Sequence, residues 1–132
     1  MPDDYWSFSR GSVIEMKLVD ISKILEAKVC SGEEKLNDLE IERVGAADMM
    51  SDVLAFAKPG MLLITGLNTP QVVRTASIVG ISTVVIVRKK QIPEETIQAA
   101  KMFGIPLLHS PLPMYTACGV LYTNNLKDIR SF

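Results

Sequence analysis

The sequence predicts an α/β fold in which helices cover a mainly parallel central sheet. Two short apolar segments, 61–65 and 83–87, lack the alternation of polar and apolar residues that a strand wetted on one face would show. Such strands are typical of parallel sheets that are covered on both faces. Helical patterns follow each of them, so strand and helix alternate along the chain. With 132 residues, the chain is expected to form a layered α/β sandwich around one core.

The connection after the first of these strands carries the clearest local signals. Gly66 ends the apolar run, Thr69 stands where a helix N-cap belongs, and Pro70 where the first helical residue belongs. The helix is expected to end at Gly80, a residue that favours a left-handed C-cap. With the strand 83–87, this completes one right-handed strand–helix–strand unit.

The second half of the chain repeats this pattern. A helix is expected to open at Pro93 and to end at Gly104. A third apolar strand follows at 105–108, where Pro106 indicates a strand start or a sheet edge. Two further prolines then lead into a last helix, which ends near Asn124.

The region before the central strand is less regular. Asp20 is expected to cap a short amphipathic helix, after which residues 28–32 become extended. Period-two alternation over 36–44 predicts a strand wetted on one face, at or near a sheet edge. Residues 46–57 have helical spacing; alternatively, Ser51 and Asp52 cap a shorter helix that begins within this run.

The ends of the chain differ from its middle. We expect residues 1–15 to be an N-terminal extension, 16–125 the α/β domain and 126–132 a C-terminal tail. The extension either is loosely ordered or docks Trp6 and Phe8 in a groove of the same chain or of a neighbour.

Composition excludes several classes of partner. The 14 basic and 15 acidic residues create no global field for a polyanion, so nucleic acid is not the expected partner. Two cysteines and one histidine do not supply a four-ligand zinc set, and we expect no metal and no cofactor. We expect no membrane span and no signal peptide, and hence a cytoplasmic protein with reduced thiols. Cys30 and Cys118 are expected in the core.

Ligands of parallel sheets bind where the carboxyl ends of the strands meet. Here those ends are 66–69, 88–91 and 109–111. The loop after the central strand opens on a helix N-terminus, which favours an anion. The candidate ligand-binding residues are Gly66, Asn68, Thr69, Arg88, Lys89 and His109, with Arg74 and Lys90 as further positive charges. The alternatives are a short connection that needs glycine only for geometry, a solvated basic loop, and a structural histidine.

Nothing in the sequence forms a catalytic set, and no catalytic residue is predicted. His109 has no acid nearby in sequence, and Ser110 lacks the GxSxG pattern. Asp48 and Asp52, one helical turn apart, either act as a pair around a cation or belong to a wet helix face. The chain contains no P-loop pattern that would cradle a nucleoside triphosphate.

Methionine and tyrosine side chains are concentrated on the predicted helices. They are Met49, Met50, Met102, Met114, Tyr115 and Tyr122. Adaptable side chains of this kind fill cores or line subunit interfaces, and both interpretations stay open. An interface would make the protein a homodimer.

Several short runs in a fixed order resemble the DRTGG domain family, in particular its small stand-alone bacterial members. The runs are DMMSDVLAFAKPG (48–60), LITG (63–66), ISTVVI (81–86), PEE (93–95), GIPLLHS (104–110) and YTA (115–117). The resemblance implies a fold similar to the N-terminal domain of HPr kinase/phosphatase, without catalytic residues. It also implies a dimerising or regulatory spacer of the kind found beside CBS domains, with a protein partner in redox or signalling.

The sequence therefore predicts a non-enzymatic regulatory or assembly module, dimeric and acting through protein–protein contacts. The alternative is a sensor of a small anion or nucleotide that binds at the loop from Gly66 to Thr69.

Overall fold

The fold contains one large, mainly parallel sheet covered on both faces by helices. The structure, a computed structural model, describes residues 15–88 and 91–129. Within them, the order of the six-stranded sheet is β2-β7-β6-β5-β4-β8. The strands from β7 to β8 run parallel to one another, and β2 is antiparallel to β7. The predicted α/β sandwich with a mainly parallel sheet is confirmed.

The elements have the following bounds. The large sheet comprises β2 (Lys28–Ser31), β4 (Arg43–Ala46), β5 (Leu62–Thr65), β6 (Thr83–Val87), β7 (Leu107–Ser110) and β8 (Lys127–Asp128). A small antiparallel sheet pairs β1 (Met16–Lys17) with β3 (Glu40–Ile41). The helices are α2 (Leu18–Ile24), α3 (Met50–Phe56), α4 (Pro70–Val79), α5 (Glu94–Phe103) and α6 (Met114–Thr123), with a short 3₁₀ helix, η1 (Glu33–Lys35).

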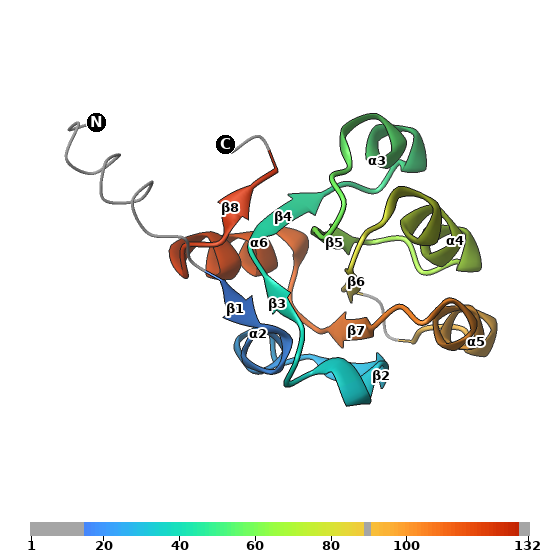
Figure 1. Cartoon of the computed structure of the whole chain (residues 1–132), viewed down its shortest axis with the longest axis horizontal. Helices are drawn as coiled ribbons and strands as arrows, with labels where there is room; N and C mark the ends of the chain where they lie inside the picture. Colours follow the sequence, from blue (N-terminus) through green and yellow to red (C-terminus); the bar gives the residue numbers. More distant parts are fainter. Residues whose placement is uncertain (1–14, 89–90, 130–132) are drawn as a thin grey trace.

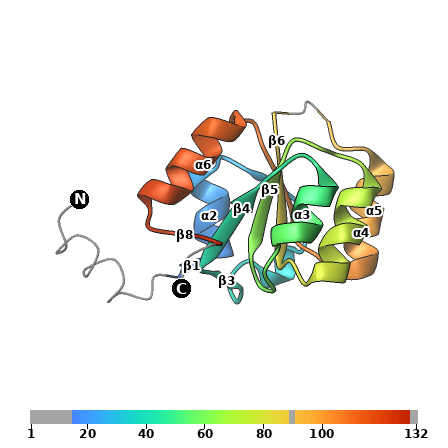
Figure 2. The same cartoon turned by 90° about the horizontal axis from the view of Figure 1, so that it is seen from above.

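Helices α3, α4 and α5 cover one face of the large sheet, and α2 and α6 cover the other (Figures 1 and 2). Each face has its own apolar core. Leu63 packs toward α3–α5, whereas its neighbour Leu62 packs toward α2 and α6. Because successive strand residues point to opposite faces, a sheet covered twice needs apolar residues at every position. This explains why the central strands show no polar alternation.

Local signals set the helix ends as predicted in the second half of the chain. Thr69 is the N-cap of α4, and Gly80 ends this helix with φ 80°. Pro93 is the N-cap of α5, and Gly104 ends it with φ 68°. Left-handed backbone at the C-cap is the conformation for which glycine is favoured.

Two expectations for the first half of the chain are wrong. Helix α2 begins at Leu18 with Lys17 as N-cap, so Asp20 lies in its first turn and does not cap it. Lys17 is held extended by its pairing in the small sheet, and this pairing sets the helix start. The single strand expected at 36–44 is two strands, β3 and β4, which belong to different sheets.

Helix α3 is shorter than residues 46–57. It begins at Met50 with Met49 as N-cap, so the shorter alternative is right, although neither Ser51 nor Asp52 caps it. The reason is that the N–H of Ala47 donates to the carbonyl of Ile64 at 3.0 Å, which extends the sheet past β4.

Strand β7 lies inside the sheet between β2 and β6, so Pro106 marks its start and not a sheet edge.

The methionine and tyrosine side chains mostly do not fill the core. Met50 is buried, but Met49, Met102, Tyr115 and Tyr122 are exposed. Cys30 and Cys118 are half-buried free thiols and not full members of the core. Trp6 and Phe8 lie outside the described residues. Among the helices of the described part of the chain, none has the length and apolar character to cross a bilayer.

Candidate functional site

Asp48, Gly66 and Arg88 form a cluster at the carboxyl edge of the large sheet. Asp48 follows β4, Gly66 follows β5 and Arg88 follows β6, three neighbouring parallel strands. Asp48 Oδ1 accepts a hydrogen bond from the Gly66 N–H at 2.7 Å. The other oxygen, Oδ2, lies 3.7 Å from Arg88 Nη2. The sheet therefore brings two of the predicted residues, Gly66 and Arg88, together with Asp48, which the sequence analysis placed either in a cation-binding pair or on a wet helix face.

Gly66 lies close to two charged side chains. A Cβ there would meet the guanidinium of Arg88 and would lie 3.1 Å from Asp48 Oδ1. A side chain would therefore push the arginine away from the loop. Because the guanidinium is the end of a flexible, half-exposed side chain, a shift of Arg88 makes room for a Cβ, so glycine is favoured at this position and not required.

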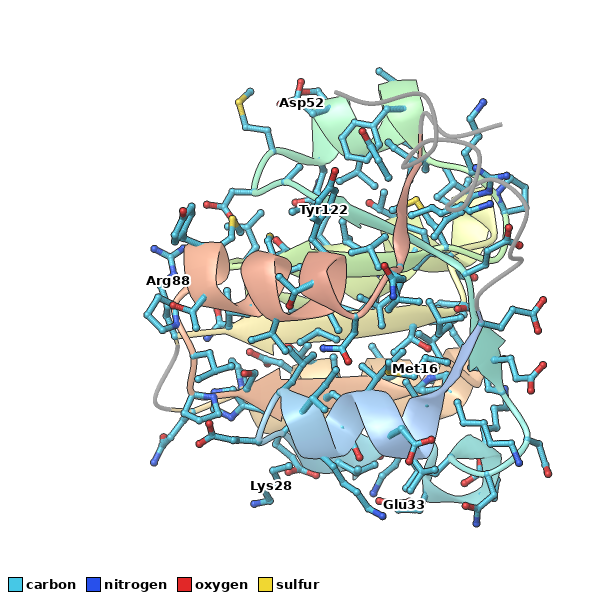
Figure 3. All side chains as sticks on the ribbon, turned by 90° about the vertical axis from the view of Figure 1, so that its left-hand side faces the viewer. Met16, Lys28, Glu33, Asp52, Arg88 and Tyr122 are labelled. Carbon is cyan, nitrogen blue, oxygen red and sulfur yellow. The ribbon has the colours of Figure 1, made fainter. Side chains whose placement is uncertain are left out.

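The backbone of Arg88 is unusual for a side chain of its size. Its φ is 67°, in the left-handed region that non-glycine residues rarely adopt. The N–H of Arg88 donates to the carbonyl of Ser110 on the neighbouring strand at 3.2 Å. Figure 3 shows Arg88 at one end of the sheet, and its side chain is 51% exposed. The ion pair with Asp48 is therefore screened by solvent, and water or a ligand has access to the guanidinium.

The rest of the loop is held by one hydrogen bond within it and by two to neighbouring segments. The N–H of Leu67 donates to Thr65 Oγ1 at 3.2 Å. The side-chain amide of Asn68 donates to the carbonyl of Gln91 at 3.1 Å, and the buried Thr96 hydroxyl donates to the carbonyl of Asn68 at 2.7 Å. The two bonds of Asn68 tie the loop to the segment before α5 and to the first turn of α5. Asn68 thus has a structural role in this state of the chain.

The remaining candidates lie around this cluster. Thr69 is exposed and makes no capping hydrogen bond through its hydroxyl. His109 lies on β7, two strands away from β5. Thr65 pairs with Ile86 and Ile86 with His109, so His109 lies about 10 Å from Thr65 across the sheet. Arg74 is exposed on α4. Lys89 and Lys90 lie outside the described residues.

Ser110 is hydrogen-bonded to the backbone, and Asp48 and Asp52 lie in different segments. The Ser110 hydroxyl is buried; it donates to the carbonyl of Leu25 at 2.7 Å and accepts from the N–H of Leu112. Asp48 precedes α3 while Asp52 lies in its first turn, so the two do not share a helix face. Among residues 15–88 and 91–129, no group of three or more His, Cys, Asp or Glu is placed to hold a metal ion.

The cluster already holds one anion, the carboxylate of Asp48. A phosphate or another carboxylate would have to take over the Gly66 N–H and the Arg88 guanidinium from it. Asp48 was missed because β4 was not predicted as a parallel strand. Its position at this edge follows from the pairing of β4 with β5, two residues before it, and no sequence pattern specifies that pairing.

Comparisons with known proteins agree with this architecture. The family model of the DRTGG domain matches residues 20–123. A similar solved structure is that of the CBS and DRTGG domains of the regulatory region of Clostridium perfringens pyrophosphatase, complexed with its activator, diadenosine tetraphosphate. The TM-score is 0.65 at 20% identity, over 84% of this chain and 47% of that one, so this chain spans about half of it. No curated protein matches the chain. The match of the family model over most of the chain places it in the DRTGG domain family.

Proposed function

We propose that the chain is a non-enzymatic regulatory module that forms a homodimer and acts through protein–protein contacts. The observation that carries this proposal is the exposed apolar surface of the α3–α5 layer. Ile78 on α4 and Met102 on α5 are 78% and 79% exposed. Large exposed apolar side chains that lie near one another are typical of contact surfaces.

Ile78 and Met102 lie at the same level of two adjacent helices. Helices α4 and α5 pack side by side after neighbouring parallel strands (Figure 1). Each residue is the ninth of a ten-residue helix. Phe103, next to Met102, is also exposed, and these three residues form what we call the α4–α5 patch. Leu54 and Met49 of the adjacent α3 segment add exposed apolar surface to the same layer.

A second copy of the chain is the partner that this patch suits best. In a two-fold symmetric dimer, the same patch serves both subunits, so an apolar patch meets an apolar patch. The formal net charge of −1 adds little repulsion between copies. A stable interface covers about 800 Å² per partner, so polar side chains around the patch would also take part. A further protein partner in redox or signalling stays a prediction.

Charge substitutions within the patch test the dimer. The chain and its variants are compared by size-exclusion chromatography with light scattering at tens of micromolar. We expect a dimer for the unmodified chain and monomers for Ile78→Glu and Met102→Glu. Tyr115→Glu is the matched control, because Tyr115 is 90% exposed on α6, which covers the opposite face of the sheet. A monomeric unmodified chain, or equal effects of all three substitutions, would contradict the proposal.

A nucleotide or small-anion sensor is the second candidate. Two observations favour it: the left-handed backbone of Arg88 at a strand end, and the diadenosine tetraphosphate complex of the similar Clostridium perfringens protein. Strained backbone often occurs where a ligand is bound. A phosphate group would accept hydrogen bonds from the Gly66 N–H and from Arg88 in place of Asp48. Asn68, Thr69, Lys89 and His109 are the further candidates for contacts with it.

Calorimetric titration separates this candidate from the first. AMP, ATP, acetyl phosphate, pyrophosphate and diadenosine tetraphosphate are titrated into the unmodified chain. A sensor gives saturable heat with at least one ligand, and Thr69→Ala and Arg88→Ala weaken the binding. Flat titrations for all five ligands would remove the sensor and leave the dimer untouched.

A further inference from the structure

An apolar groove lies at the β4–β8 end of the large sheet, between α6 and α3. Its volume is about 280 Å³. The side chains that line it are mostly apolar: Phe56, Cys118, Leu121, Tyr122, Leu126 and Ile129. Figure 3 shows Tyr122 between α6 and α3. The groove is distinct from the cluster of Asp48, Gly66 and Arg88, since none of these three residues lines it.

The described chain begins close to this groove. Met16 pairs with Ile41 in the small sheet, and the carbonyl of the next residue, Glu42, accepts a hydrogen bond from the N–H of Lys127 at 2.9 Å. Lys127 lines the groove. The path from Met16 to the groove crosses from β1 to Ile41 on β3, runs one residue along the chain to Glu42, and crosses one hydrogen bond to Lys127. These three steps together span about 14 Å, so Met16 lies within that distance of the groove wall. Figures 1 and 2 both show the start of β1 close to β8.

The fourteen residues before Glu15 carry three aromatic side chains: Tyr5, Trp6 and Phe8. Trp6 stands ten positions before Met16, and an extended chain of that length reaches about 33 Å. The segment is therefore long enough to return to the groove. Aromatic rings are large apolar groups with few rotatable bonds, and they are the usual anchors of apolar pockets.

We propose that residues 5–8 of the same chain dock in this groove, with the indole ring of Trp6 as the anchor. The groove is slightly smaller than the roughly 300–1,000 Å³ of typical ligand pockets, a size that suits one large side chain and its neighbour. The docked segment covers the outer side of β8, whose other side pairs with β4. Covering an edge strand removes a template for pairing with other chains. This proposal does not depend on the dimer or on the sensor.

Thiol reactivity tests whether the groove is covered. Cys118 lines the groove, whereas Cys30 lies on β2 at the opposite edge of the sheet. Burial raises the pKa of both thiols, which lowers the fraction of reactive thiolate. Both thiols are therefore expected to react slowly with the reagent in the unmodified chain. Two full-length variants, Cys30→Ser and Cys118→Ser, leave one thiol each and are labelled with Ellman's reagent. Adding Trp6→Ser and Phe8→Ser is expected to speed labelling of Cys118 several-fold and to leave Cys30 unchanged. An unchanged Cys118 rate would overturn the proposal.

The chain has a single tryptophan, so its fluorescence reports on Trp6 alone. We expect blue-shifted emission and weak acrylamide quenching in the unmodified chain. Tyr122→Glu places a charge in the groove and is expected to shift the emission to the red; the control Tyr115→Glu is expected not to. Both side chains are well exposed, at 67% and 90%, so both variants should fold.

The emission also shows whether the segment occupies the groove of its own chain or that of a neighbour. We expect it to stay constant on dilution, because the segment and the groove belong to one chain. An emission that shifts to the red on dilution would mean that the segment occupies a neighbour's groove, which would overturn docking within one chain. Emission typical of free tryptophan in the unmodified chain would overturn docking altogether.

Discussion

Replacing Asp48 with alanine is expected to lower the free energy of unfolding by about 1–2 kcal/mol. Gly66 is buried, and its N–H donates to Asp48 Oδ1 at 2.7 Å. A buried N–H that loses its acceptor costs about 1–3 kcal/mol. Because the Asp48 side chain is 50% exposed, water will reach part of the vacated site, and the lower half of that range applies. The 3.7 Å ion pair with Arg88 adds little, since exposed pairs contribute below about 1 kcal/mol.

Two matched variants separate the hydrogen bond from the ion pair. Asp48→Asn keeps an acceptor oxygen and removes the charge, so we expect a loss of about 0.5 kcal/mol. Arg88→Gln removes the ion pair and leaves the hydrogen bond, with an expected loss below about 0.5 kcal/mol. Urea unfolding at 25 °C measures these differences directly. In thermal unfolding, each kcal/mol should appear as a shift of about 3–6 °C at this chain length.

The order of the three variants decides whether this reasoning is right. If Arg88→Gln destabilises as much as Asp48→Ala, the ion pair dominates the cluster. If Asp48→Ala unfolds like the unmodified chain, the Gly66 N–H needs no protein acceptor. Either result would refute the assigned role of Asp48.

The remaining predictions concern backbone strain and a carboxyl pair. Gly32→Ala is expected to lower the free energy of unfolding by about 2–4 kcal/mol, because φ is 88° and the new Cβ would lie 2.7 Å from the Cα of Pro106. Gly60→Ala is the control, since φ is similar at 85° but no described atom lies within 4 Å of the new Cβ. In the same urea assay, it should lower the free energy of unfolding by only about 1 kcal/mol. Equal losses would mean that the contact with Pro106 is relieved without strain. A hydrogen bond with Glu40 and repulsion from its charge raise the pKa of Glu15 above 4.5. Protonated Glu15 therefore stabilises the fold fully below pH 4.5, and this stabilisation is lost as the pH rises through the raised pKa. Glu15→Gln is therefore expected to raise Tm at pH 7 and to leave it nearly unchanged at pH 4, and the reverse pattern would contradict the direction of the shift.

The part of the fold that could be predicted is the part that local physics determines. Unbroken apolar runs predicted β5 and β6, and Pro70, Gly80 and Gly104 marked helix ends through their own backbone preferences. Strands β3, β4 and β8 have two to four residues each, and they exist because of partners far away in sequence. No pattern in so short a segment specifies such a partner. The alternation over 36–44 accordingly ran across two different sheets.

The candidate site was predictable only in part, for the same reason. Gly66 and Arg88 follow strands that could be recognised, so their place at the sheet edge was predicted. Asp48 follows β4, which could not be recognised as a parallel strand, and its place at that edge was missed. The exposure of the helix residues could not be predicted from the sequence pattern either. Helical spacing gives the direction in which a side chain points, but not whether a neighbouring helix covers it.

Sedimentation equilibrium of the unmodified full-length chain, between about 1 and 100 μM, tests the proposed dimer most directly. We expect the weight-average mass to rise with concentration from 14.5 kDa toward twice that value. A mass that stays at 14.5 kDa over the whole range would contradict the proposal that this chain works by pairing with a second copy.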